Sequence, residues 1–218
     1  MDKKKKIILI TLIVIIALLV IIGIILSVTS KNNSTTTEEK QVNNTNILSL
    51  SNELQEKSAF TINLVKDDNN KMYYAKQNNE AYIDTIYNGK ESKYIIKDGN
   101  TYLLLDDSKM YYTYSNNQVN LNKIENTLNK IKELEYQEGK EEVNGKNYNY
   151  IEYLTSTDFT LDDFSKDKNV KTRFYFDNND NLVYIKTISD EKEELLSFEF
   201  SDGVDSNLFE IPSDYTEG

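Results

Sequence analysis

Hydrophobic and polar residues alternate along most of the chain after residue 58, and this period of two is typical of β-strands. Phe60, Ile62 and Leu64 are examples: each is followed by a residue that would point to the opposite face. The Asp98-Gly99 pair between two such segments is a strong hairpin signal. The pattern predicts six antiparallel strands in the first half of the domain, at residues 58–65, 71–77, 80–87, 94–97, 101–105 and 110–114.

In mid-chain the period changes to that of a helix. Apolar residues at steps of three and four form one helical stripe, which consists of Leu121, Ile124, Leu128, Ile131 and Leu134. A short amphipathic helix is also predicted near residues 47–57. Further strands are predicted at residues 136–143, 146–154, 170–177, 182–189 and 193–201.

The apolar stripe of the mid-chain helix must be buried against another element, and the sheet is the available partner. The predicted fold is therefore α+β. A large curled antiparallel sheet, an incomplete barrel of about ten or eleven strands, carries the mid-chain helix on its concave face.

The N-terminal part of the chain has a different pattern. Residues 7–28, from Ile7 to Val28, contain no charge, and a helix of this length spans about 33 Å, which matches a hydrocarbon core of about 30 Å. Four lysines at positions 3–6 precede it, and the positive-inside rule places that end in the cytoplasm. A cleaved signal peptide is the alternative, although its apolar region is normally shorter.

These features predict a single-pass protein of the cell membrane with four parts. They are a cytoplasmic basic tail (1–6), a transmembrane helix (7–28), a flexible tether (29–45) and an extracytoplasmic β-rich domain (46–218).

Composition narrows the chemistry of this domain. The chain has a formal net charge of -11 and contains neither Cys nor His. An acidic domain is repelled by nucleic acid, which is therefore not an expected partner. Disulfides, thiolate nucleophiles, a lipid-modified cysteine and histidine chemistry are excluded. The acidic run at residues 177–181 lacks the glycine and glutamate of a calcium loop and is predicted to be a hairpin turn. We expect no metal and no cofactor.

Aromatic residues leave two interpretations open. Nine tyrosines lie within residues 73–114, and tyrosine suits a half-buried pleated surface. They either cover the outer face of the sheet or line its concave face for an apolar ligand. Arg173, the chain's only arginine, is predicted to be a surface or cross-strand charge.

Two segments carry a resemblance to a known family. Residues 94–102 (YIIKDGNTY) form the predicted hairpin, and residues 208–215 (LFEIPSDY) combine an apolar pair, the only proline and a tyrosine. With the order of elements, they make residues 47–218 resemble the bacterial lipoprotein-carrier superfamily, whose LolA/LolB-like members are incomplete β-barrels around helices. The resemblance implies an apolar cavity that holds acyl chains. The predicted transmembrane tether departs from that family's soluble or lipid-anchored carriers, so transport between two membranes is not implied.

Three functions from different classes stay open. The preferred one is a non-enzymatic domain that holds a lipid or other apolar ligand in a groove between sheet and mid-chain helix. A structural or protein-interaction module of the cell envelope, with a filled core, is the second. A carboxylate-based cell-wall hydrolase is the third. The expected partners are the bilayer, an apolar ligand and an envelope protein. The candidate groove lining is apolar throughout and comprises Phe60, Ile62, Leu64, Ile96, Leu104, Leu121, Ile124, Leu128, Ile131, Phe174, Phe176, Phe198 and Phe200.

The topology can be tested by protease accessibility. Protease added to intact protoplasts is expected to digest residues 30–218 and to leave a small membrane-bound stub. Glutamates in place of the four lysines at 3–6 are expected to scramble the orientation, because these charges set it. The same change at Lys31 and Lys40 in the tether is the control and is expected to have little effect. Protection of the domain, or its release with a new N-terminus near residue 30, would contradict the prediction.

Overall fold

A computed structural model describes residues 45–115, 134–155, 170–189 and 192–218. Its elements, in chain order, are α2 (Thr45–Glu56), β1 (Ala59–Asp67), β2 (Asn70–Gln77), β3 (Glu80–Tyr87), β4 (Lys90–Lys97), β5 (Asn100–Leu105), β6 (Met110–Ser115), β7 (Tyr136–Val143), β8 (Lys146–Thr155), β9 (Val170–Phe176), β10 (Leu182–Ile188), β11 (Glu193–Asp202), the 3-10 helix η1 (Ser206–Phe209) and β12 (Thr216–Glu217).

The twelve strands within these described residues belong to one sheet, in the order β12-β6-β5-β4-β3-β2-β1-β11-β10-β9-β8-β7. Two antiparallel meanders, β1 to β6 and β7 to β11, are joined where β1 pairs with β11. The two-residue β12 adds a parallel pairing at the edge strand β6. Since β12 and β7 stand at opposite ends of the order, the described sheet is not closed.

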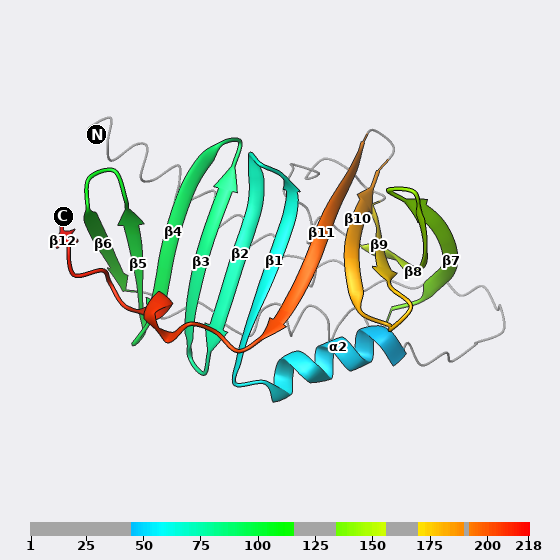
Figure 1. Ribbon diagram of the computed structural model, residues 1–218, viewed down its shortest axis with the longest axis horizontal. Helices are drawn as coiled ribbons and strands as arrows, with labels where there is room; N and C mark the ends of the chain where they lie inside the picture. Colours follow the sequence, from blue (N-terminus) through cyan, green and yellow to red (C-terminus); the bar gives the residue numbers. More distant parts are fainter. Residues whose placement is uncertain (1–44, 116–133, 156–169, 190–191) are drawn as a thin grey trace, which may run out of the picture.

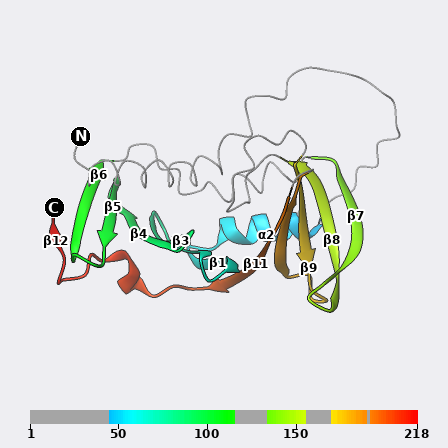
Figure 2. The same ribbon diagram turned by 90° about the horizontal axis from the view of Figure 1, so that it is seen from above.

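The sheet is strongly curled into a trough. Its middle strands form the floor, and the strands toward β6 and β7 rise as walls (Figures 1 and 2). Helix α2 lies on the inner side of the curve, along the ends of β11, β10 and β9, whereas the C-terminal segment runs along the outside (Figures 1 and 2). The large antiparallel sheet predicted from the alternating pattern is therefore confirmed.

Hairpin turns stand where the turn residues predict them. At the Asp98-Gly99 turn both residues have positive φ, 52° and 72°, which is the conformation of a two-residue hairpin turn whose twist matches the flanking strands. The Asn144-Gly145 turn has the same pair of positive φ values, 51° and 78°. The run at residues 177–181 is also a turn, in which the Asp177 carboxylate accepts hydrogen bonds from the backbone N–H groups of Asn179 and Asn181 at 2.8 and 2.9 Å.

The convex face has an apolar cluster of its own, because the sheet is apolar on both sides of β2 to β5. We call it the convex cluster: Ala75, Tyr82, Ile95, Leu104 and Phe209. Residues 203–218, here called the C-terminal strap, cover this cluster with η1. Lys97 of β4 contacts Glu210 of the strap at 3.0 Å, and the Tyr215 hydroxyl donates to the Asp106 carboxylate. The strap thus converts an apolar outer surface into core.

Two predicted helices cannot be compared with the structure. The transmembrane segment and tether (7–45) lie outside the described residues except for position 45, and so does the mid-chain helix except for Leu134. That residue forms a bend rather than a helix and is 41% exposed. The described helix on the concave face is α2, the amphipathic helix predicted near residues 47–57. Among the described helices, none combines the length and apolarity that crossing a bilayer requires.

The role of the strap can be tested at Phe209, which is 1% exposed. Phe209→Ala is expected to lower the free energy of unfolding by about 3–5 kcal/mol, because a large buried ring is lost and a cavity remains. The control is Leu154→Ala, at a side chain 64% exposed, and its expected effect is within about 0.5 kcal/mol. Urea unfolding followed by circular dichroism measures both. A loss below about 1 kcal/mol at Phe209 would show that the strap is not part of the core.

Candidate functional site

The concave face of the trough is the candidate site. It is formed by the alternation of apolar and polar residues along the strands. Every second residue of a strand points into the trough, and these inward residues form one continuous apolar cluster with α2. We call this the concave cluster. It comprises Ile47, Leu50, Leu54, Phe60, Ile62, Tyr74, Ala81, Ile83, Tyr94, Ile96, Leu103, Ile151, Tyr153, Phe174, Phe176, Leu182, Ile185 and Phe198.

Most predicted lining residues on the described strands meet here. Six of them are members of the concave cluster, namely Phe60, Ile62, Ile96, Phe174, Phe176 and Phe198. Leu64 and Phe200 are partly buried and pack against it. Strands from both meanders therefore contribute to a single surface. The four predicted positions on the mid-chain helix, Leu121, Ile124, Leu128 and Ile131, lie outside the described residues.

The prediction that Leu104 lines the concave face is wrong. It belongs to the convex cluster on the opposite face. Residues 103–105 of β5 are three consecutive leucines, so their pattern contains no alternation from which the inward residue could be chosen. The register decides it: Leu103 pairs with Tyr94, a concave residue, and adjacent strand residues point to opposite faces.

The tyrosines divide between the two faces. Tyr74 and Tyr94 lie in the concave cluster, whereas Tyr82 lies in the convex cluster with Tyr73 and Tyr102 packed against it. Burial raises the pKa of the Tyr94 phenol well above its usual value. Tyrosines therefore lie on both faces of the sheet, and the alternation of side chains along each strand decides which face each one occupies. Whether those on the concave face contact a ligand stays a prediction.

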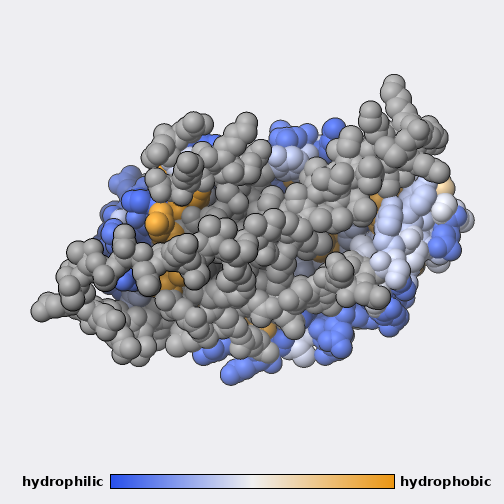
Figure 3. Space-filling model, turned by 180° about the vertical axis from the view of Figure 1, so that it is seen from behind, coloured by the Kyte–Doolittle hydropathy of each residue, from blue (hydrophilic) through white to orange (hydrophobic). Residues whose placement is uncertain are grey.

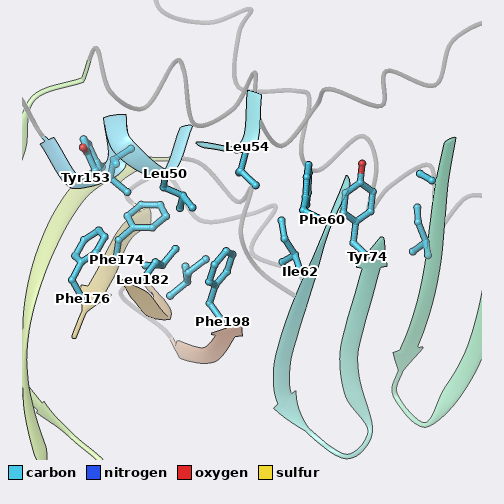
Figure 4. Close-up of a cluster of buried hydrophobic side chains, with 14 of the residues drawn as sticks. Leu50, Leu54, Phe60, Ile62, Tyr74, Tyr153, Phe174, Phe176, Leu182 and Phe198 are labelled. Carbon is cyan, nitrogen blue, oxygen red and sulfur yellow. The ribbon is translucent and has the colours of Figure 1, made fainter. Parts of the chain in front are cut away.

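Helix α2 covers one part of the concave face. Leu50 and Leu54 point toward Phe174, Leu182 and Phe198 (Figure 4), and all five are buried. Sequence analysis left these helix residues out of the lining, although their spacing marks the apolar face of α2.

Further along the same face, Phe60, Ile62 and Tyr74 project from β1 and β2 into the trough (Figure 4). Figure 3, which views the molecule from the concave side, shows separate patches of apolar atoms within the face and hydrophilic side chains along the rims. The inward residues of the concave cluster therefore provide apolar contact area.

Charged side chains stand near both ends of this surface. Lys66 forms an ion pair with Glu194 at 3.2 Å, and Lys76 lies over the Phe60 ring at 5.6 Å from its centroid. Glu194 and Lys76 are buried. The concave face is thus apolar along its length and polar at its ends.

A second group of charged side chains lies on the convex side of β7 to β10. Arg173 donates from Nη1 to Glu141 at 2.6 Å and from Nε to Glu152 at 2.7 Å. Glu141 also accepts from the Tyr175 hydroxyl at 2.6 Å and from Lys186 at 2.9 Å. Arg173 is therefore a cross-strand charge, as predicted.

The environment of Glu141 is unsuited to acid catalysis. Burial would raise the pKa of its carboxyl group, but the hydrogen bonds from Tyr175, Lys186 and Arg173 outweigh burial and lower the pKa to about 2. The pKa of Glu152 is lowered as well, since the hydrogen bonds from Arg173 and Lys171 outweigh its burial. A general acid near neutral pH needs a raised pKa. Within the described ranges, no cluster of acidic residues has the arrangement of a metal site.

Comparison with known proteins finds solved structures that resemble this chain but assigns it to no family. No family model and no curated protein matches the chain. An uncharacterized conserved protein from Thermus thermophilus aligns over 79% of this chain and 96% of its own, with a TM-score of 0.44 and 8% identity. The Mycobacterium tuberculosis lipoprotein LppX aligns over 73% of this chain and 95% of its own, with a TM-score of 0.42 and 13% identity. The resemblance to lipoprotein carriers stays a prediction.

The lowered pKa of Glu141 predicts a pH-dependent contribution to stability. A carboxylate whose pKa is lowered on folding stabilises the fold fully above its unfolded pKa, and this contribution is lost as the pH falls toward the folded value of about 2. Glu141→Gln is expected to cost about 2 kcal/mol at pH 7. The difference from the unmodified protein should shrink below about pH 4.5.

The neighbouring exposed residue provides the control, since Glu142 lies on the same strand with its side chain on the other face. Glu142→Gln is expected to change stability by less than about 0.5 kcal/mol at any pH. Denaturant unfolding measured from pH 7 to pH 3 distinguishes the two variants. An effect of Glu141→Gln that does not change with pH would contradict the assignment.

Proposed function

We propose that the β-rich domain is a non-enzymatic binding domain that holds the acyl chain of a lipid, or a similar apolar group, on the concave face of the trough. The observation that carries the proposal is the uninterrupted apolar row along the paired strands β1 and β11. Phe60, Ile62 and Leu64 stand beside Phe198 and Phe200 on the inward side of this pair.

The dimensions of the row suit one acyl chain. From Phe60 to Lys66 the row measures about 20 Å at about 3.4 Å per residue. One leaflet of a bilayer, which one layer of acyl chains fills, is about 15 Å thick. The acyl chain of an ordinary membrane lipid would therefore fit within the length of the row.

The expected membrane anchor supplies a source of such ligands. A flexible tether of residues 29–45 would hold the domain within about 25 Å of the bilayer on average. The proposal that the domain works outside the cytoplasm beside the membrane rests on this expected anchor. The resemblance to lipoprotein carriers implies the same class of ligand.

A filled core is the second candidate, and one observation favours it. Phe60, Ile62, Tyr94 and Leu103 are each at most 2% exposed. Burial this complete is typical of side chains packed against other protein atoms. The domain would then act through its surface, as an interaction module of the cell envelope. We propose no hydrolase activity, because the carboxylates that the described strands bring together around Arg173, Glu141 and Glu152, are both engaged by its guanidinium group.

One substitution separates the two candidates. Ile83 lies in the concave cluster, and Ile83→Trp adds a large ring to the trough. If the trough holds a ligand, the ring takes the place of the acyl chain and stability changes little. If the core is filled, the ring overpacks it and costs about 1–3 kcal/mol. Ile86→Trp on the opposite face of the same strand is the matched control.

The measurement combines cross-linking with stability. Membranes containing the full-length chain are incubated with a fatty acid that carries a photoreactive group within the acyl chain, and labelled peptides are mapped by mass spectrometry. Labelling is expected on residues 59–67 and 193–202, and Ile83→Trp should reduce it about tenfold or more, since the ring removes most of the contact area. Absence of labelling, together with destabilisation by Ile83→Trp, would replace the ligand-binding proposal with the filled core.

A further inference from the structure

The apolar row on β1 and β11 ends in polar residues at one end. On β1 the inward residues Phe60, Ile62 and Leu64 are followed by Lys66, and on β11 Glu194 lies near the start of the strand, within ion-pair distance of Lys66. Thr187 of β10 stands directly opposite Glu194 in the register. A carboxylate, an ammonium group and a hydroxyl group therefore gather where the apolar surface stops. We call these three residues the polar end.

Two members of the polar end are almost completely buried. Glu194 and Thr187 are each 1% exposed. The Glu194 carboxylate forms an ion pair with Lys66 at 3.2 Å, and Lys66 itself is partly exposed. Buried carboxylates are rare because their desolvation is costly. The fold therefore keeps a charge where an apolar side chain would be more stabilising.

The hydroxyl group of Thr187 is the second, independent observation. Its Oγ1 atom has no hydrogen-bond partner in the described part of the chain. A buried hydroxyl left without a partner costs about 1–3 kcal/mol. Thr187 points into the trough beside Glu194, so a ligand atom bound there would remove this cost. Valine, which has the same shape without the hydroxyl group, would avoid the cost altogether.

We infer that the polar end binds the head of an amphipathic ligand whose acyl chain lies along the apolar row, and that this head carries hydrogen-bond donors. The inference rests on the proposed function and adds the chemical class of the ligand. A carboxylate only accepts hydrogen bonds, while a threonine hydroxyl both donates and accepts. Hydroxyl or ammonium groups therefore fit beside Glu194. The carboxylate of a free fatty acid has no hydrogen to donate and would meet the like charge of Glu194, while the ammonium group of Lys66 is already engaged in the ion pair with Glu194.

The other end of the row carries a positive charge, and this difference between the two ends makes the inference testable. Lys76 is buried near Phe60, and its ammonium group lies 5.6 Å from the ring centroid. An anionic head would be attracted to this end instead. The orientation of the bound lipid thus follows from its head: donors lie at Glu194, whereas an anionic head would lie at Lys76.

The experiment compares three lipids with the same acyl chain on the full-length protein in phosphatidylcholine nanodiscs. They are a monoacylglycerol, a long-chain amine and a free fatty acid, each with a photoreactive group. Tighter half-saturation is expected for the monoacylglycerol or the amine than for the fatty acid, by about tenfold, the value of a hydrogen bond to a charged group. The first two lipids distinguish a hydroxyl head from an ammonium head.

Variants then assign the preference to the polar end. Glu194→Gln is expected to abolish the preference for donor heads, and Thr187→Val to weaken binding of the monoacylglycerol about fivefold, the value of one neutral hydrogen bond. The matched control is Glu199→Gln on the same strand, where the exposed side chain lies on the convex face and accepts from Asn63 at 3.3 Å. This control is expected to retain the preference.

A readout on the unmodified protein protects the test against variants that fail to fold. A photoreactive group next to the lipid head is expected to label residues 182–188 and 193–196, and one at the chain terminus to label residues 59–62 and 74–77. Binding without head preference, or the reversed labelling pattern, overturns the inference and leaves the proposed function intact. Failure of all three lipids to bind overturns the proposed function as well.

Discussion

Strand β1 ends at Asp67 and β11 begins at Glu193, yet the two pair in register from Phe60 opposite Asp202 to Val65 opposite Ser197. This contact between the two ends of the domain joins two meanders that would otherwise be separate sheets. It also places the inward residues of β1 beside Phe198 and Phe200, and it brings Lys66 within reach of Glu194. Contacts so distant in sequence form only after a large loss of chain entropy, so the hydrophobic gain along this row must offset that loss.

Because the sheet is apolar on both faces, each face must also be buried by another segment of the chain. On the concave side, α2 covers the part near β10 and β11 with Leu50 and Leu54. On the convex side, the C-terminal strap brings Phe209 onto the convex cluster, and its β12 pairs with the edge strand β6. The strap therefore buries an apolar surface and pairs part of an open edge, and both would otherwise favour association with other chains.

On this acidic domain, one group of ion pairs links neighbouring strands of the second meander. Arg173 and Lys186 link β7, β8, β9 and β10 through Glu141 and Glu152 on the convex side. On the concave side, the charged side chains Lys76 and Glu194 and the hydroxyl group of Thr187 stand near the ends of the apolar row. This distribution leaves the middle of the trough to apolar contacts, which are non-directional and suit a flexible chain.

The sequence by itself determined most of the strands, the turns between them and the type of sheet, because alternation and turn residues are local properties. Asp98 with Gly99 and Asn144 with Gly145 show this, since both pairs tolerate the positive φ that their turns require. The alternation of apolar and polar residues along the strands was also enough to place six of the proposed lining residues on one face. The tertiary structure decided which face is concave, which strands are neighbours, and where α2 and the strap lie. Leu104 shows what the sequence could not determine. Three consecutive leucines show no alternation of apolar and polar residues, so only the register of β5 assigns Leu104 to the convex face. The ion pair between Lys66 and Glu194 shows it again: their meeting depends on the long-range pairing of β1 with β11, which no local pattern contains.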